Sequence, residues 1–404
     1  MPTSLILVFW CTLKGNLPCA QRAVKNLSLL RIQLGRTTLT EQLYSKQAIK
    51  LLLKSVSIFQ NKKMRTFLCT SVALMFFSQG LAGVYRPYDI YRPGARAMGA
   101  GATGVSNIDS IGTIGQNPSY LADISESAFA VGLDAQTRIN RIQTQVSLQP
   151  QYIPVLAWGA PITENLGGGV IIQSPFQRRF PDDNFIVYTM EAAAAYPLTR
   201  RVNIGVTGGA LVGLQSDRFA AWSATWSVSA LYHADSFTLG MFFRPGAELS
   251  YQPFSTGALV DEKLPDFFKF GVSTHIKKVK LAFEVEHASF AGTYFRRNGV
   301  DITPNFRRGF FGNFHPRVGA DFPMPWWPGL VFRTGMFTED FFDFSGGNER
   351  QILWTLGFGG IAGSDFWGDK LRIDFSLASS FIPSFFWTES NQIEKLQVTF
   401  EFIY

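Results

Sequence analysis

Large apolar side chains alternate with polar or charged ones along many segments of this chain, and this period of two residues limits its fold more than any other feature. The segment VKLAFEVEH (279–287) places Leu281 and Phe283 on one face and Glu284 and Glu286 on the other, and KLRIDFSL (370–377) does the same. Successive side chains of a β-strand point to opposite faces. After residue 83, no apolar run is long enough for a transmembrane helix. We therefore predict an all-β body whose strands have one apolar and one charged face.

The final residues, LQVTFEFIY (396–404), keep this alternation up to Tyr404. A sheet that crosses lipid must close on itself, because every backbone N–H and C=O needs an internal partner. The last strand then pairs with the first. An apolar alternation that ends in an aromatic residue also resembles the C-terminal signal of proteins delivered to the bacterial outer-membrane barrel assembly machinery, so we expect that machinery as a partner.

We predict 14 strands, at 127–137, 151–161, 164–176, 185–198, 200–216, 221–235, 237–250, 266–278, 279–291, 315–324, 328–339, 352–363, 370–381 and 395–404. Short connections fall on every second junction, and longer ones, such as 251–265 and 292–314, take most of the others. This pattern is typical of an outer-membrane barrel. A soluble sandwich is the alternative, with its charged faces in water. Aromatic residues make up 15% of the chain, and Trp near strand ends favours the barrel, where it forms girdles at the lipid headgroups.

Charge and cysteine both divide the chain at residue 82. Of the 37 Lys and Arg residues, 11 precede residue 83, together with one acidic residue, which leaves residues 83–404 with 26 basic and 29 acidic residues. The basic character therefore belongs to the N-terminal extension, and we expect no nucleic-acid partner. Cys11, Cys19 and Cys69 also precede residue 83. A body without thiols suits export to an oxidising compartment.

Residues 64–82 have the features of a cleavable signal peptide. A basic start at 62–65 precedes an apolar run at 67–77, and Gly80 and Ala82 supply the small residues of a cleavage site. Met64 begins this signal, so we interpret 1–63 as a mis-assigned start or a disordered extension, with a genuine cytoplasmic extension as the alternative. A lipoprotein anchor at Cys69 is disfavoured, because this Cys precedes most of the apolar run.

Residues 83–126 do not alternate and are rich in Gly and Ala, as in RPGARAMGAGATGVSNIDSIGTIGQNPSYLADI (92–124). A barrel of about 14 strands has a lumen wide enough to need filling, and small residues allow close backbone packing. We therefore predict a plug, or hatch, at 83–126 inside a barrel formed by 127–404. A plain N-terminal linker is the alternative.

Two motifs in this stretch resemble the N-terminal hatch of the FadL/TodX family of outer-membrane transporters for hydrophobic compounds, and of the related PorV-like barrels. They are GARAMGAG (94–101) and NPSYL (117–121), with an acidic residue between them. Ser119 stands where the family most often has Ala. The hatch residues that correspond to the family pattern are Arg96, Gly99, Gly101, Asp109, Asn117 and Pro118.

The resemblance covers essentially all of 83–404 and implies a 14-stranded barrel closed by the hatch. Ligand would be captured among the outer loops and would leave sideways where the third strand bends inward. That strand contains NLGGGVIIQSP (165–175). Gly167, Gly168, Gly169 and Pro175 are the candidates for this lateral opening, because Gly marks a bend or a close backbone approach and Pro cannot donate to the ladder. The alternative is that these glycines simply open a strand after a turn.

The predicted loop 292–314 holds the candidates for ligand capture. Arginine binds carboxylate or phosphate in a bidentate manner, and phenylalanine offers apolar surface; solvated loop charge is the alternative. The body is shorter than a typical fatty-acid transporter, and we expect the loss in the external loops. The candidate capture residues are Arg296, Arg297, Arg307, Arg308, Phe310, Phe311 and Phe314.

No motif indicates an enzyme. The four His residues lack zinc-like spacing, and GAGATG (99–104) lacks the preceding strand of a phosphate loop. We predict no catalytic residue, no metal and no cofactor, and we expect the charges on the inner face to pair across strands. The predicted function is passive uptake of hydrophobic small molecules, most plausibly long-chain fatty acids, by a monomer in the outer-membrane lipid of a diderm bacterium. A PorV-like scaffold or shuttle for secreted surface proteins is the alternative; a general porin fits poorly, because a plug blocks free flow.

Overall fold

A computed structural model describes residues 86–90, 94–140, 145–150, 155–180, 183–215, 219–254, 259–289, 292–301, 314–327, 329–342, 348–366, 369–380 and 391–404. They all belong to one compact unit, Gly80–Tyr404. The predicted extension (1–63) and signal peptide (64–82) lie outside the described residues.

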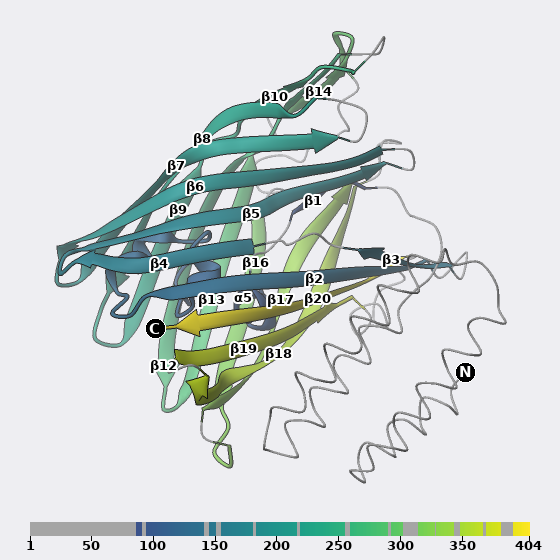
Figure 1. Ribbon diagram of the computed structural model, residues 1–404. Coiled ribbons are helices and arrows are strands. Elements are labelled where there is room, and N and C mark those ends of the chain that lie inside the picture. Colours follow the sequence, from purple (N-terminus) through teal and green to yellow (C-terminus); the bar gives the residue numbers. More distant parts are fainter. Residues whose placement is uncertain are drawn as a thin grey trace. The chain divides into compact units, whose positions relative to one another are not determined.

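Antiparallel strands form a closed barrel (Figure 1). In the described part of the chain one sheet contains 16 strands, and 14 of them make the wall. Ala128–Asn140 of the first wall strand align with Ile403–Asn391 of the last, which closes the ring. The predicted all-β barrel is thus confirmed, and each predicted strand overlaps one wall strand. These are β2 (Ala128–Asn140), β4 (Val155–Thr163), β5 (Leu166–Phe180), β6 (Asp183–Thr199), β7 (Val202–Gln215), β8 (Ala221–His233), β9 (Phe237–Arg244), β12 (Asp266–Ile276), β13 (Val279–Ser289), β16 (Phe314–Pro323), β17 (Leu330–Phe342), β18 (Asn348–Phe366), β19 (Asp369–Ser379) and β20 (Asn391–Ile403).

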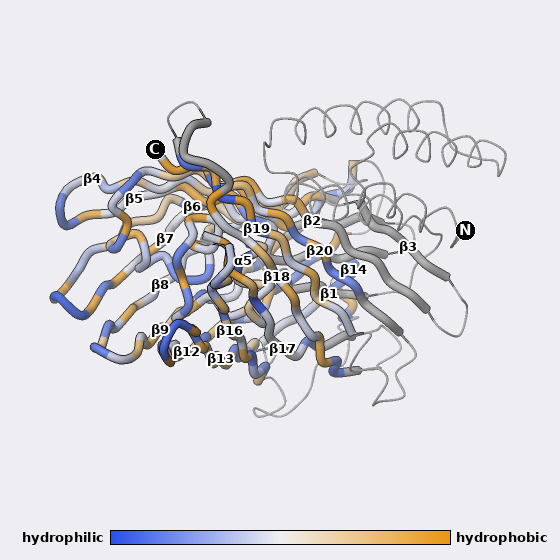
Figure 2. The backbone as a smooth tube through the Cα atoms, turned by 90° about the horizontal axis from the view of Figure 1, so that it is seen from below, coloured by the Kyte–Doolittle hydropathy of each residue, from blue (hydrophilic) through white to orange (hydrophobic). Residues whose placement is uncertain are grey.

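Burial alternates along the wall strands as the sequence predicts. In β13, Leu281 and Phe283 are exposed on the outer face, whereas Glu284 and Glu286 are buried inside. Figure 2 shows hydrophobic and hydrophilic residues alternating along the strands. A soluble sandwich would bury its apolar face and expose its charges. The barrel wall instead exposes its apolar face and buries its charges. Among the described residues, no helix is both long enough and apolar enough to span a membrane.

The short connections all lie at one end of the barrel. They follow β4, β6, β8, β12, β16 and β18, and successive wall strands run antiparallel. The end of β20 is also there, where the Tyr404 N–H donates to the Ser127 carbonyl oxygen at 2.9 Å.

The opposite end carries a second sheet that the sequence did not predict. Its four strands are β10 (Glu248–Tyr251), β11 (Val260–Lys263), β14 (Tyr294–Arg297) and β15 (Val300–Asp301). The predicted strand 237–250 is therefore wrong in its second half, because β9 ends at Arg244 and the chain leaves the wall. Apolar side chains of this sheet, including Leu249 and Tyr251, pack against inner residues of the wall such as Leu211 and Phe267.

Two further strands join the main sheet without completing a place in the ring. β3 (Gln145–Pro150) pairs with β2, and β1 (Arg86–Ile90) pairs with β5. Between β1 and β2 are three short helices: α5 (Ala95–Gly99), η1 (Ile111–Thr113) and η2 (Pro118–Ala122).

Candidate functional site

Residues 94–127, called here the inner segment, lie inside the ring. The Gly101 N–H donates to Thr355 Oγ1 on β18 at 3.0 Å, and the Ser119 N–H donates to Ser229 Oγ on β8 at 3.0 Å. Arg317 on β16 donates to the Ala102 carbonyl oxygen at 3.2 Å. These three strands occupy different parts of the ring, so only an interior position allows all three contacts.

One wall carboxylate holds a turn of the inner segment. Glu284 Oε1 on β13 accepts from the N–H groups of Gly104, Val105 and Ser106 at 2.8, 2.6 and 3.0 Å. Glu284 is 1% exposed. A buried carboxylate is costly without partners, and three charge-assisted hydrogen bonds supply them. The charge of Glu284 therefore fixes the inner segment to the wall.

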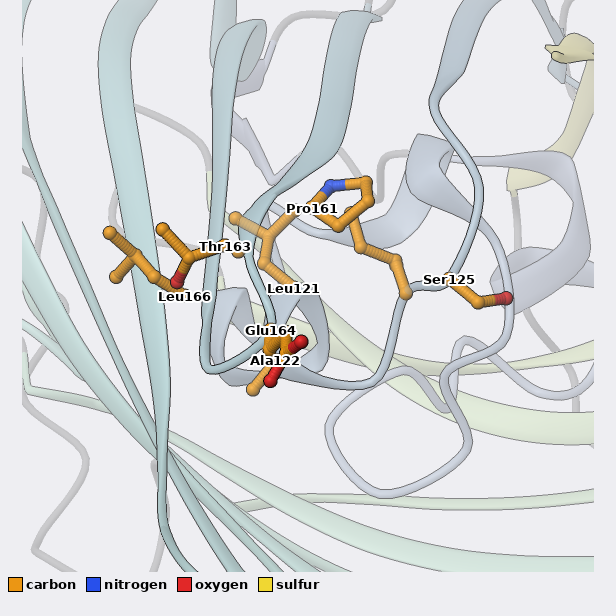
Figure 3. Close-up of a pocket in the computed structure, with 9 residues that line it drawn as sticks. Leu121, Ala122, Ser125, Pro161, Thr163, Glu164 and Leu166 are labelled. Carbon is orange, nitrogen blue, oxygen red and sulfur yellow. The ribbon is translucent and has the colours of Figure 1, made fainter.

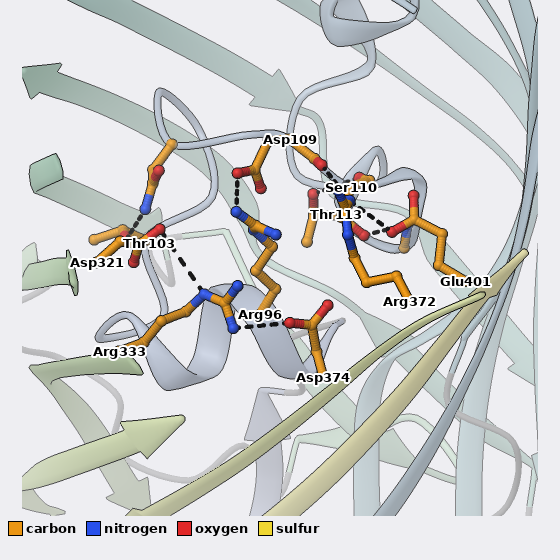
Figure 4. Close-up of polar contacts among 12 residues, drawn as sticks. Arg96, Thr103, Asp109, Ser110, Thr113, Asp321, Arg333, Arg372, Asp374 and Glu401 are labelled. Atoms are coloured by element: carbon orange, nitrogen blue, oxygen red, sulfur yellow. Dashed lines mark hydrogen bonds and ion pairs between the residues drawn. The ribbon is translucent and has the colours of Figure 1, made fainter. Parts of the chain in front are cut away.

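An ion pair inside the inner segment links α5 to the residues before η1 (Figure 4). The guanidinium of Arg96 donates to the carboxylate of Asp109. Burial alone would raise the pKa of Asp109, but the positive charges of Arg96, Lys280, Arg333 and Arg372 together outweigh burial and lower this pKa below its ordinary value. Asp109 is thus ionised at neutral pH, and Arg372 on β19 ties the same place to the wall by donating to the Asp109 carbonyl oxygen at 2.9 Å.

Asn117 and Pro118 shape the turn that begins η2. The Asn117 side chain accepts from the Ser119 N–H at 3.2 Å and donates to the Val105 carbonyl oxygen at 2.7 Å. Pro118 occupies the first position of η2, where its missing N–H costs nothing. Asn117 therefore joins the start of η2 to the turn at Val105.

Inward-facing glycines of the wall leave room for the inner segment. A Cβ on Gly205 of β7 would lie 2.3 Å from the Ser119 nitrogen, and one on Gly240 of β9 would lie 2.1 Å from the Val105 oxygen. These glycines were not predicted from the sequence, although they have the strand parity of the inward-facing residues, such as Asn203 and Thr207 on β7. Others that approach the inner segment in the same way are Gly167, Gly319, Gly335 and Gly357.

The remaining inner face of the wall carries paired charges. Glu286 contacts Arg317 at 2.5 Å and Lys269 at 3.2 Å, and Glu191 contacts Arg244 at 2.6 Å. The predicted pairing across strands is therefore present. Further pairs are Arg333 with Asp374, Arg372 with Glu401 and Lys395 with Glu339. Within the described residues, no group of three or more His, Cys, Asp or Glu side chains is placed to hold a metal ion.

Several solved structures, including a hydrocarbon channel and a toluene transporter, share this architecture. One is a Pseudomonas aeruginosa FadL homologue, with 11% identity, a TM-score of 0.58, and coverage of 80% of this chain and 99% of that one. The FadL fold is present here. The CymD monoaromatic hydrocarbon channel matches with 12% identity, a TM-score of 0.57, and coverage of 78% and 98%. The Ralstonia pickettii toluene transporter TbuX matches with 13% identity, a TM-score of 0.56, and coverage of 81% and 99%. No family model and no curated protein sequence matches the chain.

Within this FadL fold, the six residues that resemble the hatch motif all lie in the inner segment. Gly99 packs against Gly357, where a Cβ would lie 2.9 Å from the Gly357 Cα. Gly101 has a φ of 68°, in the left-handed region that favours glycine. The motif thus contains an ion pair, a turn formed by Asn117, and two positions where the structure leaves no room for a side chain.

The glycine run of the third wall strand of the FadL fold, β5, lies in a regular ladder. Gly167, Gly168 and Gly169 align with Ala195, Ala194 and Ala193 of β6. A Cβ on Gly167 would lie 1.8 Å from the Leu121 oxygen, so this glycine serves a close backbone approach. The irregularity comes later: the register of β5 and β6 shifts between Gln173 and Phe176, on either side of Pro175.

The structure describes three of the seven predicted capture residues, and their role stays a prediction. Arg296 and Arg297 are exposed on β14, and the Arg296 guanidinium lies 4.1 Å from the Tyr294 ring centroid. Phe314 begins β16, with its ring centroid 4.7 Å from that of His287. Arg307, Arg308, Phe310 and Phe311 lie outside the described residues.

A small pocket of about 280 Å³ lies where the inner segment meets the turn between β4 and β5 (Figure 3). Leu121, Ala122 and Ser125 of the inner segment line it, together with Pro161 and Glu164 of β4 and the turn after it. Ligand pockets are usually larger, about 300–1,000 Å³. The pocket lies at the short-turn end of the barrel.

Proposed function

We propose that this protein is an outer-membrane channel for the uptake of hydrophobic small molecules. The observation that carries the proposal is the closed ring of strands, which is apolar on its outer face and charged on its inner face. A segment of the same chain is hydrogen-bonded to the inner face. An apolar belt around a closed ring suits lipid. The interior segment argues against free flow of water-soluble solutes. The similar structures of CymD, a monoaromatic hydrocarbon channel, and TbuX, a toluene transporter, support the same class of ligand.

Pairing of the inner charges favours an uncharged ligand over a fatty acid. Every Lys and Arg that is buried in the described wall already has a carboxylate partner: Arg244, Lys269, Arg317, Arg333 and Lys395. A carboxylate ligand would have to displace one of these partners and leave it unpaired, which is costly inside a protein. Long-chain fatty acids, expected from the family resemblance, therefore rank behind neutral hydrocarbons in the proposal.

Uptake into vesicles tests the proposal and separates the two ligand classes. Purified protein is folded into phospholipid vesicles, and entry of radiolabelled toluene, oleate and sucrose is followed. We expect toluene to enter faster than in empty vesicles, oleate to enter more slowly than toluene, and sucrose to stay out. Entry of sucrose would instead indicate a porin. Normal toluene uptake by cells that lack the gene, together with loss of their secreted surface proteins, would indicate the scaffold function.

A further inference from the structure

Basic residues gather on three neighbouring turns at the short-turn end of the barrel. These turns, 200–201, 234–236 and 277–278, are called here the basic arc. They join β6 to β7, β8 to β9 and β12 to β13, and these six strands follow one another in the sheet. Strands lie about 4.8 Å apart, so neighbouring turns are about 10 Å apart along the rim. The arc contains one acidic residue, Asp235, and four basic ones, Arg200, Arg201, Lys277 and Lys278.

Contacts between the turns hold the basic arc together. The Arg201 guanidinium pairs with Asp235 at 3.1 Å, and the His233 N–H donates to the Arg201 carbonyl oxygen at 2.7 Å. Thr274 Oγ1 on β12 donates to the Ser236 carbonyl oxygen at 2.7 Å. The first turn is thus bonded to the second, and the second is bonded to the strand that leads into the third. The cations are therefore presented by a connected rim.

Three of the four cations of the arc have no carboxylate partner in the part of the chain that the structure describes. Only Arg201 is in an ion pair, and the other three are exposed. Elsewhere on this rim, the exposed Lys370 already pairs with Glu126 at 2.7 Å. Four basic residues against one acidic residue leave the arc with a net charge of +3. The arc is therefore a concentrated positive patch on one side of the rim.

Lys277 keeps a charged side chain in a backbone conformation that favours glycine. Ile276 and Val279 are aligned partners, so Lys277 and Lys278 alone make the turn. The φ of Lys277 is 57°, in the left-handed region where a Cβ is unfavourable. Gly or Asn is the usual residue at such a position of a two-residue hairpin. Backbone strain of this kind points to a functional side chain, and the feature that Lys277 supplies is a positive charge.

The outer face of the wall beside the basic arc is apolar. Leu198 and Ile276 lie one or two residues before the cations, and both are exposed. The rings of Tyr232 and Phe237, on either side of the middle turn, lie 6.3 Å apart. Aromatic side chains are favoured where a wall strand reaches the headgroup level. The apolar side chains and the cations thus follow in the order in which a phospholipid presents its acyl chains and its headgroup.

We propose that the basic arc binds the headgroups of anionic phospholipids in the adjacent leaflet of the membrane. Cations at a membrane surface attract anionic lipid, and both Arg and Lys bind phosphate. A lipid is favoured over a soluble polyanion or the cell wall because the cations adjoin lipid-facing side chains. The inference requires the barrel to span a membrane, but it goes beyond the proposed function and does not depend on which molecule the channel carries.

Lipid retention tests the inference. Purified protein is incubated with mixed micelles that contain phosphatidylcholine and phosphatidylglycerol in equal amounts, and it is then passed through gel filtration. The lipids that it retains are quantified by mass spectrometry. The variant K277Q/K278Q removes two cations of the arc. Its charge-matched control is R296Q/R297Q, which removes an adjacent pair of exposed cations from the second sheet, at the opposite end of the barrel.

We expect the wild-type protein to retain phosphatidylglycerol over phosphatidylcholine by roughly tenfold, and to lose this preference near 1 M salt, where the Debye length is about 3 Å. K277Q/K278Q should lose most of the preference, whereas R296Q/R297Q should keep it. Equal retention of the two lipids by the wild type, or an equal loss in the two variants, would overturn the inference. So would wild-type protein that shows no lipid preference but sediments with isolated peptidoglycan, because the arc would then bind the cell wall.

A second variant separates the charge of Lys277 from the shape of its turn. Lys277→Gly removes the charge and suits the left-handed backbone, so we expect it to unfold at a higher urea concentration than the wild type in phosphatidylcholine vesicles. Added phosphatidylglycerol should stabilise the wild type more than this variant, because a ligand that binds the folded state stabilises it. Equal stabilisation of the two proteins would contradict the inference, whatever the channel transports.

Discussion

Single glycines decide how closely the inner segment approaches the wall. Gly205 and Gly208 are three residues apart on β7, but a Cβ on Gly205 would lie 2.3 Å from a backbone nitrogen of the inner segment, and one on Gly208 would have nothing within 4 Å. We expect Gly205→Ala to destabilise the protein by about 1–3 kcal/mol through overpacking, and Gly208→Ala to have little effect. Urea unfolding in vesicles, followed by Trp fluorescence, measures the difference in stability. Equal unfolding midpoints for the two variants would show that the inner segment shifts to accommodate the added methyl group.

The Arg96–Asp109 pair gives the inner segment a pH dependence of definite sign. Arg96, with smaller contributions from Lys280, Arg333 and Arg372, lowers the pKa of Asp109 below the ordinary value of 3.8, against the effect of burial. The pair therefore contributes stability at and above pH 3.8, and that contribution is lost as the pH falls through the lowered pKa. We expect protease cleavage within 94–127 to stay constant from pH 7 to about 4 and to rise only below it. The Asp109→Asn variant should lack that rise; an identical rise would exclude this pair as its cause.

At the scale of elements, the second sheet depends on a few buried side chains. Tyr251 on β10 is fully buried in the apolar cluster with Leu249, Phe295 and Phe267. We expect Tyr251→Ala to cost about 3–5 kcal/mol locally and to speed amide hydrogen exchange in β10, β11 and β14, but not in β2 or β20. Val300→Ala on the exposed β15 is the control and should change neither. Equal acceleration across the barrel would mean that the second sheet and the wall unfold together.

Periodicity predicts the long strands well and the short ones poorly. Segments such as 279–289 alternate for ten residues or so, and their two faces meet different solvents, so the sequence alone indicates them. β10, β11 and β14 have four residues each, and their apolar partners lie far away along the chain. The wall glycines could not be predicted for a related reason. Their role is to leave space for the inner segment, and the sequence does not show which backbone lies opposite each of them.

The hatch motif could be located from the sequence, but its contacts could not. Arg96 and Asp109 stand out because they are charged residues in a stretch of small ones. The wall partner of Asp109 comes from β19, 263 residues later, where Arg372 donates to the Asp109 carbonyl oxygen. This contact depends on closure of the ring, so the sequence around either residue does not indicate it.

At the scale of the whole molecule, the outer face of the barrel determines how stably the protein folds into a membrane. Phe283 in the middle of β13 and Ile276 at the short-turn end of β12 are 48% and 56% exposed. We expect Phe283→Arg to reduce the free energy of folding into vesicles by about 2–4 kcal/mol and Ile276→Arg by about 0–1 kcal/mol, because the cost of a charge falls from the bilayer centre to its surface. Equal effects in a folding titration would place β13 outside the hydrocarbon core.

The glycines that face the inner segment also constrain the order of assembly. Their missing side chains fit the backbone of the inner segment on several strands around the ring, so the wall is shaped to close around a segment that is already in place. Threading 94–127 into a finished cylinder is therefore implausible on steric grounds. The N-terminal coil and the last strand should become protected in the same kinetic step, as two parts of one nucleus.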